Sequence, residues 1–318
     1  MTKFAFLFPG QGSQAVGMLN GFAGNAVVDQ TVAEASDALG FDLARMIAEG
    51  PKEDLDLTTN TQPVMLTAAV AVYRAWIAAG GPVPNMVAGH SLGEYSALVA
   101  AGVIPFKDAV PLVRFRAGAM QDAVPVGQGG MAVILGLGAD DVAAVCKQAA
   151  SERTGAVVEP VNFNEPTQIV IAGHSAAVER ACELAKEKGA KRAMKLAVSA
   201  PFHSSLLQPA SDRLKAYMSG IEFAAPAIDL VNNVDVAVLR DPAAIKEALV
   251  RQAARPVRWV ESMQFMANQG IELVIESAPS KVLIGMAKRI VARLAGEALV
   301  DQAALERVLD IVGKQQAQ

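Results

Sequence analysis

One five-residue segment, Gly89-His90-Ser91-Leu92-Gly93, limits what this chain of 318 residues can fold into more than any other stretch. It follows a short apolar run, Met86–Ala88, and precedes a helical pattern over Glu94–Ala101. A G-x-S-x-G motif between a strand and a helix is typical of a nucleophile elbow, a tight turn whose flanking glycines leave no side chain to clash. The N–H of Leu92 then lies at the start of the helix, where it can hold an oxyanion. The segment predicts Ser91 as a nucleophile, with a purely structural turn as the alternative.

The first part of the chain alternates strands and helices. We expect a strand over Lys3–Phe8 and a helix over Thr61–Ala79, with Asn60 as its N-cap. A further helix is expected over Phe106–Ala123, after which a proline and the glycine-rich stretch Gly127–Gly130 break the pattern. We therefore place a domain boundary there.

Residues 128–198 have a pattern of their own, with the order β-α-β-β-α-β. The expected segments are Met131–Leu137, Asp140–Ala150, Val157–Phe163, Gln168–Ala172, Ser175–Lys188 (with Ser175 as N-cap) and Arg192–Val198. This order predicts a split-βαβ, or ferredoxin-like, small domain. It would be inserted in a larger α/β domain of residues 1–127 and 199–318, whose later segments are Leu206–Met218, Ile228–Asn232, Ala243–Ala253, Val257–Asn268, Leu273–Glu276 and Lys281–Leu294.

Composition and charge narrow the class of protein. Hydrophobic residues make up 52% of the chain and aromatic residues only 5%, which suits helices packed on a parallel sheet. The net charge of −4 argues against a nucleic-acid partner. We also expect no membrane segment, since the most apolar helix candidate contains Arg74, and no signal peptide, since Phe4–Phe8 is too short. Cys146 and Cys182 show no metal-ligand spacing and are expected to be free, buried thiols of a cytoplasmic protein without a metal site.

A serine nucleophile needs a base, and the chain offers three histidines. His90 adjoins Ser91, so its side chain should leave the backbone in another direction and serve packing or hydrogen bonding. His174 lies in a turn beside Ser175 and is expected at the surface. His203 lies where the chain re-enters the larger domain, a common place for catalytic groups, and is therefore the predicted base.

No acid stands out as the third member of a triad. Asp229, Asp235 and Asp241 are the nearest candidates downstream of the histidine, and none follows a distinctive strand end. No Asp or Glu between Ser91 and His203 stands out either. We therefore expect a Ser–His pair whose imidazole is oriented by something other than a carboxylate.

Six motifs in order along nearly the whole chain resemble those of the malonyl-CoA:acyl carrier protein transacylases. They are Phe8-Pro9-Gly10-Gln11-Gly12-Ser13-Gln14, Thr61-Gln62-Pro63, Gly89 to Tyr95, Val113-Arg114-Phe115-Arg116, Ala200-Pro201-Phe202-His203-Ser204 and Val250-Arg251-Gln252. The resemblance implies an α/β-hydrolase-like domain with an inserted ferredoxin-like domain. It also implies transfer of a malonyl group from coenzyme A to the phosphopantetheine thiol of acyl carrier protein, through an ester on the serine.

The resemblance also implies roles for single residues. His203 acts as general base and then acid, and the backbone carbonyl of Gln252 orients it. The backbone N–H groups of Gln11 and Leu92 form the oxyanion hole, and Arg116 binds the free malonyl carboxylate. The remaining pocket residues are expected to be His90, Phe202, Gln62 and Asn162, with Phe202 as a wall that favours the small malonyl group.

Helical periodicity alone does not select Arg116. Arg114 and Arg116 flank the apolar stripe of their helix on opposite sides, so without the family a solvated charge is the favoured interpretation of each. Gln11 and Gln252 would likewise be taken as ordinary polar residues.

One stretch departs from the family pattern. A sequence Glu-x-Gly-Pro-Gly-Lys is expected near the C-terminus, and this chain has Glu276-Ser277-Ala278-Pro279-Ser280-Lys281. Because glycines are placed where φ is positive or the backbone passes close to something, Ser277, Ala278 and Ser280 are expected to alter the turn rather than the chemistry. They also fit a specialised relative, such as a transacylase of a polyketide pathway.

The implied partners are a coenzyme A thioester and an acidic carrier protein, with no cofactor and a single chain as the working unit. Five cations near the end of the small domain could dock the carrier: Lys186, Lys188, Lys191, Arg192 and Lys195. A solvated basic face is the alternative. Other functions left open are a related acyltransferase of polyketide or malonate metabolism, a serine hydrolase, and a scaffold without catalysis.

Overall fold

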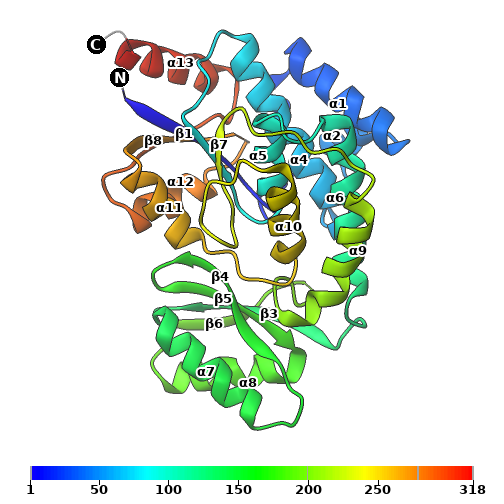
Figure 1. Ribbon diagram of the computed structural model, residues 1–318, viewed down its shortest axis with the longest axis vertical. Coiled ribbons are helices and arrows are strands. Elements are labelled where there is room, and N and C mark those ends of the chain that lie inside the picture. Colours follow the sequence, from blue (N-terminus) through cyan, green and yellow to red (C-terminus); the bar gives the residue numbers. More distant parts are fainter. Residues whose placement is uncertain (1, 199, 278, 317–318) are drawn as a thin grey trace.

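The computed structural model describes residues 2–198, 200–277 and 279–316. Figure 1 shows a mixed α/β fold with one parallel and one antiparallel sheet. The strands of the parallel sheet are β1 (Lys3–Phe8), β2 (Met86–Gly89), β7 (Asp229–Val231), β8 (Ile271–Glu276) and β9 (Ala295–Ala298), and those of the antiparallel sheet are β3 (Gly129–Leu135), β4 (Val158–Glu165), β5 (Gln168–His174) and β6 (Arg192–Lys195). The helices are α1 (Ala26–Leu39), α2 (Leu43–Glu49), α3 (Lys52–Leu55), α4 (Thr58–Ala78), α5 (Gly93–Ala100), α6 (Phe106–Asp122), α7 (Ala139–Ser151), α8 (Ser175–Glu187), α9 (Gln208–Met218), α10 (Pro242–Gln252), α11 (Trp259–Asn268), α12 (Val282–Ile290) and α13 (Gln302–Gln316), with short 3-10 helices η1 (Asn20–Phe22) and η2 (Ser205–Leu207).

The parallel sheet has the strand order β7-β2-β1-β8-β9 and is buried on both faces. Residues of β1 alternate between the two faces, as the period of a strand requires. Phe6 packs edge-on against Tyr73 and Trp76 of α4, with ring centroids 5.2 and 5.4 Å away. Ala5 and Leu7 belong to the core on the other face, which α11 and α12 cover. Two covered faces explain why the strands are almost continuously apolar.

The antiparallel sheet has the order β4-β5-β3-β6 and also separates two cores. Ala132 and Ile134 of β3 face α7 and α8, which Figure 1 shows on the outer side of the sheet. Met131 and Val133 point the other way, into a core shared with α6 and with the segment around Phe202. The face of the antiparallel sheet that carries Met131 and Val133 therefore lies toward the part of the molecule that contains the parallel sheet.

The carboxyl ends of β1, β2 and β7 meet at one edge of the parallel sheet. The chain passes from β1 into the loop of Gln11, from β2 into Ser91, and from β7 into Asn232 and Asn233. Parallel strands bring such loops together, and open α/β sheets bind ligands at this edge. The fold therefore places three loops from distant parts of the sequence beside one another.

Several local expectations are wrong in detail. Helix α4 begins at Thr58 rather than Thr61, because the Asn60 amide donates to the carbonyl of Asp54 (2.9 Å) instead of capping its own helix. At α8, His174 is the N-cap, and the Ser175 hydroxyl donates to the carbonyl of Gly129 (2.9 Å).

The expected helix over Lys281–Leu294 is divided. Helix α12 ends at Ile290, where Val291 turns to an extended conformation, and the chain then forms β9 beside β8. After this point the chain pairs with β8 as a parallel strand instead of continuing the helix. Helices α1, α2, α3 and α13 were not anticipated from the sequence. Cys146 and Cys182 are free and buried, as expected.

Candidate active site

The turn between β2 and α5 has the geometry that its glycines require. Ser91 adopts a positive φ of 52°, a region that side chains other than glycine seldom occupy. A Cβ on Gly89 would lie 1.9 Å from the carbonyl of Gly93, and a Cβ on Gly93 would lie 1.9 Å from the carbonyl oxygen of Phe8. The predicted clash beside the serine is therefore confirmed, and it fixes both glycine positions.

Ser91 and His203 are in direct contact. The Ser91 Oγ lies 2.7 Å from Nε2 of His203, whose Nδ1 lies 2.8 Å from the backbone carbonyl oxygen of Gln252. A carbonyl can only accept, so Nδ1 carries the proton and Nε2 is free to accept from the serine hydroxyl. His203 also adopts a positive φ of 65°, and strained backbone of this kind clusters at functional sites. The arrangement is a serine beside a neutral imidazole that a backbone carbonyl orients.

The three aspartates considered as triad members have other partners. Asp229 pairs with Arg240, Asp235 pairs with Arg251 at 2.7 Å, and the Asp241 carboxylate accepts from the first turn of α10. Among the described residues, it is the Gln252 carbonyl and not a carboxylate that contacts the Nδ1 side of the imidazole.

The other two histidines have separate contacts. His90 Nε2 donates to Asn164 Oδ1 of β4 (2.8 Å), and its ring meets Trp259 edge-on at 5.4 Å. Burial lowers the pKa of His90, so the ring is neutral. His174 accepts the backbone N–H of Val157 at 3.0 Å. Both histidines therefore link segments of the fold.

Arg116 is buried beside the serine, with only 1% of its surface exposed. One Nη donates to Gln62 Oε1 (2.8 Å), and the other donates to Ser91 Oγ (3.1 Å) and to Gln252 Oε1 (3.0 Å). The guanidinium lies 5.2 Å from the ring of Tyr95, and the Arg116 Nε has no hydrogen-bond partner in the described part of the chain. Among the described residues, no carboxylate forms an ion pair with Arg116. Because a guanidinium keeps its proton in proteins, the site holds a buried cation ready for an anion.

The interpretation of Arg116 as a solvated charge is therefore wrong. It describes Arg114 instead, which is exposed and stacks on Phe41 at 4.8 Å. Periodicity treats the two arginines alike, and the packing of α6 against α4 buries only one of them.

Electrostatics hold His203 in the neutral form. Burial is the main cause that lowers its pKa to about 3, and the charge of Arg116 lowers it further. A neutral imidazole can take a proton from a serine at physiological pH.

The cavity in front of Ser91 has a volume of about 430 Å³. Every predicted site residue lines it except Gln252, which lies behind His203 and reaches the site through its carbonyl and its amide. The lining residues are Gln11, Gly12, Gln14, Lys52, Asp56, Gln62, His90, Ser91, Leu92, Arg116, Met120, Met131, Asn162, Leu196, Ala197, Val198, Phe202 and His203.

Sequence reasoning missed two polar residues behind this cavity, Glu94 and Asn233. The Ser91 N–H donates to Asn233 Oδ1 (2.8 Å), and Glu94 accepts from the N–H of Asn233 (2.9 Å). Their positions in the sequence could have pointed to them, because Glu94 lies one turn after the elbow and Asn233 lies just after a parallel strand.

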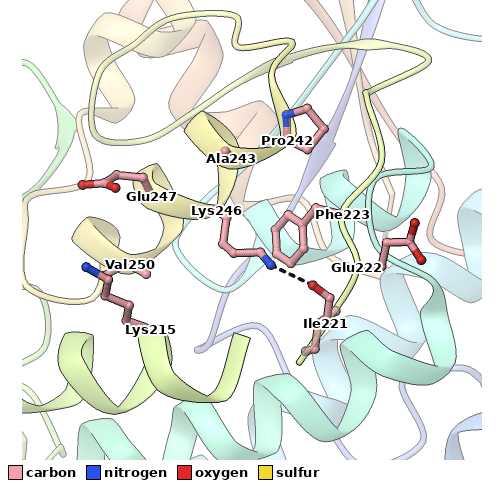
Figure 2. A pocket seen from close by; sticks show the side chains of 9 residues that line it. All are labelled: Lys215, Ile221, Glu222, Phe223, Pro242, Ala243, Lys246, Glu247 and Val250. Atoms are coloured by element: carbon pink, nitrogen blue, oxygen red, sulfur yellow. Dashed lines mark hydrogen bonds between the residues drawn. The ribbon is translucent and has the colours of Figure 1, made fainter. Parts of the chain in front are cut away.

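A second cavity of about 390 Å³ lies between α9 and α10 and shares no lining residue with the first (Figure 2). The Lys246 ammonium donates to the carbonyls of Ile221 (2.7 Å) and Met218 (2.9 Å) and lies 4.8 Å from the ring of Phe223. These contacts tie Lys246 to the C-terminal end of α9. This cavity lacks the serine–imidazole contact of the first one.

The departure near the C-terminus is accommodated locally. The Ser277 hydroxyl donates to the carbonyl of Ala69 (2.9 Å), and the Ser280 hydroxyl contacts Glu276. The buried Glu276 also accepts from backbone N–H groups at the start of α12. Ala278 lies outside the described residues. The two serines therefore bind within the turn and beneath it rather than in the cavity.

No group of three or more His, Cys, Asp or Glu residues among those that the structure describes could hold a metal ion. Within the same residues, no helix is both long and apolar enough to cross a membrane.

Comparisons with known proteins place the chain among acyltransferases. A family model described as an acyl transferase domain matches residues 5–315. The malonyl CoA-acyl carrier protein transacylase of Salmonella typhimurium is 54% identical over 310 residues, covering 97% of this chain and 99% of the relative. The protein of the same name from Escherichia coli K12 is 53% identical over 312 residues, covering 98% and 100%.

Solved structures agree with these relatives. The acyl-carrier-protein S-malonyltransferase of Burkholderia pseudomallei is 64% identical with a TM-score of 0.95, covering 97% of this chain and 100% of that one. A malonyl-transacylase in complex with its type II PKS acyl-carrier protein is 50% identical with a TM-score of 0.95, covering 97% and 99%.

Proposed function

The chain belongs to the acyl transferase family, and we propose that it moves a malonyl group from malonyl-CoA to the phosphopantetheine thiol of acyl carrier protein. The product, malonyl-acyl carrier protein, feeds fatty-acid synthesis. The observation that carries the proposal is the buried Arg116, whose guanidinium lies 3.1 Å from the Ser91 hydroxyl. A hydrolase of neutral esters has no use for such a cation, whereas a malonyl group carries a free carboxylate to match it.

In the first half of the reaction, His203 takes the proton of Ser91 and the serine oxygen attacks the thioester carbonyl. The 2.7 Å contact between Oγ and Nε2 supports this step. The tetrahedral intermediate collapses, coenzyme A leaves, and its sulfur receives the proton from His203. A malonyl ester then remains on Ser91.

In the second half, the phosphopantetheine thiol attacks that ester. His203 takes the thiol proton and returns a proton to the serine oxygen as the new thioester forms. Both halves pass through an oxyanion, which we assign to the backbone N–H groups of Gln11 and Leu92. Leu92 is the N-cap of α5, so its N–H lies at the positive end of the helix, and Gln11 follows the carboxyl end of β1.

We assign the malonyl carboxylate to Arg116 and the orientation of His203 to the carbonyl of Gln252. Arg116 lines the cavity, and its Nη group 3.1 Å from Ser91 Oγ places the guanidinium where a carboxylate on an ester of that serine would lie. The side chains of Gln62, His90, Asn162 and Phe202 line the same cavity and complete the proposed pocket.

The mass of the intact protein tests this function directly. After mixing with malonyl-CoA, we expect an adduct of one malonyl group that is stable alone and disappears when carrier protein with its phosphopantetheine arm is added. An adduct that decays at the same rate with or without the carrier would indicate a hydrolase. An adduct with another acyl-CoA only would indicate a related acyltransferase.

A polyketide carrier is the second candidate partner. It is favoured by the 50% identity to a malonyl-transacylase solved with a type II PKS acyl-carrier protein. The chemistry at Ser91 is the same for both carriers, so discharge onto one carrier or the other distinguishes them.

For the architecture, we propose an α/β-hydrolase-like domain of residues 1–127 and 199–318 with an inserted ferredoxin-like domain of residues 128–198. The order β3-α7-β4-β5-α8-β6 and the sheet order β4-β5-β3-β6 support the second unit. The parallel sheet with helices on both faces supports the first.

The basic cluster is the proposed docking face for the acidic carrier, because β6 leads directly into Leu196, which lines the cavity. Lys188 pairs with Asp141 at 2.9 Å and Lys195 pairs with Glu179. Because these two charges already have partners, the prediction concerns Lys191 and Arg192. Reversing the charges of Lys191 and Arg192 to Glu is expected to slow discharge onto the carrier about tenfold at low salt and to leave loading from malonyl-CoA unchanged. Stopped-flow mixing measures both steps, and equal discharge rates would remove the docking role.

The shifted pKa of His203 predicts the pH dependence of loading. Because that pKa lies near 3 rather than at the ordinary 6.5, His203 stays neutral as the pH falls. We expect kcat/KM for malonyl-CoA to stay flat between pH of about 8 and about 5. In Arg116→Ala the pKa rises, so loss of activity with acetyl-CoA should begin at a higher pH. A wild-type acid limb centred near the ordinary histidine value would contradict the prediction.

We further propose that a single chain works in the cytoplasm without a cofactor. The chain itself supplies the serine, the base and the buried cation, so the proposed chemistry needs no residue from a second copy. The free thiols of Cys146 and Cys182 fit a reducing compartment.

A further inference from the structure

Glu94 is a carboxylate with 1% of its surface exposed, one turn of helix after the nucleophile. Its Oε2 accepts from the backbone N–H of Asn233 and from Nε2 of Gln252, both at 2.9 Å. Burial raises the pKa of Glu94 to about 7, and the hydrogen bonds from Asn233 and Gln252 and the charge of Arg116 act in the opposite direction. A carboxyl group buried this deeply needs such partners.

The two ends of the Gln252 amide make different kinds of hydrogen bond, because the nitrogen donates and the oxygen accepts. Its Nε2 donates to Glu94 and to the carbonyl of Ser91 (3.0 Å), and its Oε1 accepts from Arg116 (3.0 Å). The Glu94 Oε2 and the Ser91 carbonyl accept from the amide nitrogen, and a guanidinium only donates, so these neighbours together permit one orientation of the amide. Gln252 thus transmits the position of Glu94 to the guanidinium.

We propose that Glu94 is a positioning residue for malonyl selectivity, which holds the Gln252 amide so that its oxygen keeps the Arg116 guanidinium beside Ser91. The proposal rests on the proposed function, because it assigns Arg116 to the malonyl carboxylate. Glu94 does not line the cavity, so it acts through Gln252 and not on the substrate.

Replacing Glu94 by Gln keeps the shape and replaces a carboxylate by a neutral amide. Both donors meet Oε2, so the single oxygen of the new amide can still accept from Asn233 and Gln252. A neutral oxygen holds these donors less strongly than a carboxylate does, and the attraction of the negative charge for Arg116 is lost. The Gln252 amide, and the guanidinium that it contacts, are then held less firmly beside the serine oxygen.

The test compares malonyl-CoA with acetyl-CoA, a donor of nearly the same size without the carboxylate. In Glu94→Gln we expect kcat/KM for malonyl-CoA to fall about 30-fold and that for acetyl-CoA to fall less than about threefold, so that the selectivity ratio drops at least about tenfold. The drop should appear in KM for malonyl-CoA more than in kcat.

Glu276→Gln is the matched control. Glu276 is also a fully buried carboxylate that accepts two backbone N–H groups, from Leu283 (2.9 Å) and Ile284 (3.1 Å), and it does not line the cavity. We expect this variant to lose stability but to keep the selectivity ratio. If Glu94→Gln does not fold, Gln252→Ala tests the same link, since it removes the amide and keeps the carbonyl that orients His203; its ratio should also fall.

An equal loss with both donors in Glu94→Gln, or an unchanged ratio, would overturn the proposal. In the Arg116→Ala background, adding Glu94→Gln should leave the ratio unchanged, because no guanidinium remains to be positioned. Failure of the proposed function looks different, since the wild-type protein would then form no malonyl adduct at all.

Discussion

Ser91→Ala is expected to abolish the malonyl adduct and to lower the rate of transfer by roughly 10⁴- to 10⁶-fold, because no oxygen remains to carry the ester. The fold should survive. Ser91 contributes its backbone N–H to Asn233, which alanine retains, and the positive φ of 52° is already present in the wild-type turn. Intact-protein mass after mixing with malonyl-CoA measures the adduct, and thermal unfolding checks the fold.

Ser96→Ala provides the matched control for this variant. Ser96 is a fully buried serine on α5, the helix that follows the elbow, and its hydroxyl has no hydrogen-bond partner among the residues that the structure describes. Its removal should leave adduct formation at the wild-type level. A malonyl adduct that persists in Ser91→Ala would mean that another group is the nucleophile, and the roles assigned to His203 and Arg116 would go with it.

The sequence was most informative where backbone geometry dictates residue type. The elbow glycines are required because each Cβ would lie 1.9 Å from a backbone atom, so the motif could be interpreted without a structure. His203 followed by elimination, since only three histidines compete. Its orienting group could not be found this way, because a backbone carbonyl has no signature in the sequence.

Helical and strand periodicity could not identify residues whose roles depend on packing between elements that are distant in the sequence. Arg116 and Arg114 stand two positions apart on one helix, and only the contact of α6 with α4 decides which is buried. Glu94 and Asn233 were missed for the same reason. Their contact joins α5 to the loop after β7, 139 residues apart in the chain.

Helix and strand boundaries failed where a residue had a partner in another element. Asn60 is a good N-cap by type, but its amide binds the end of α3. The segment after Ile290 continues a helical pattern, but β8 offers it backbone partners as a parallel strand. In both places a tertiary contact replaced the local preference.

Arg116→Ala is expected to lower kcat/KM for malonyl-CoA about a thousandfold while neutral acyl groups still react. The guanidinium is the buried cation beside Ser91, and a malonyl carboxylate brought into the cavity without it would lose its water and gain no counter-charge. The acetyl group of acetyl-CoA has no free carboxylate to desolvate, so the preference for malonyl-CoA over acetyl-CoA should be lost. Initial rates with each donor measure this.

Two further arginine variants separate charge from geometry. Arg114→Ala removes an exposed arginine from the same helix and should keep the wild-type preference for malonyl-CoA. Arg116→Lys keeps a positive charge but loses the planar fork that binds a carboxylate through two N–H groups, so it should recover only part of the malonyl rate. If Arg116→Ala retained the malonyl preference, the carboxylate would have to bind elsewhere in the cavity, and the buried guanidinium would serve only to hold Gln62, Ser91 and Gln252 together.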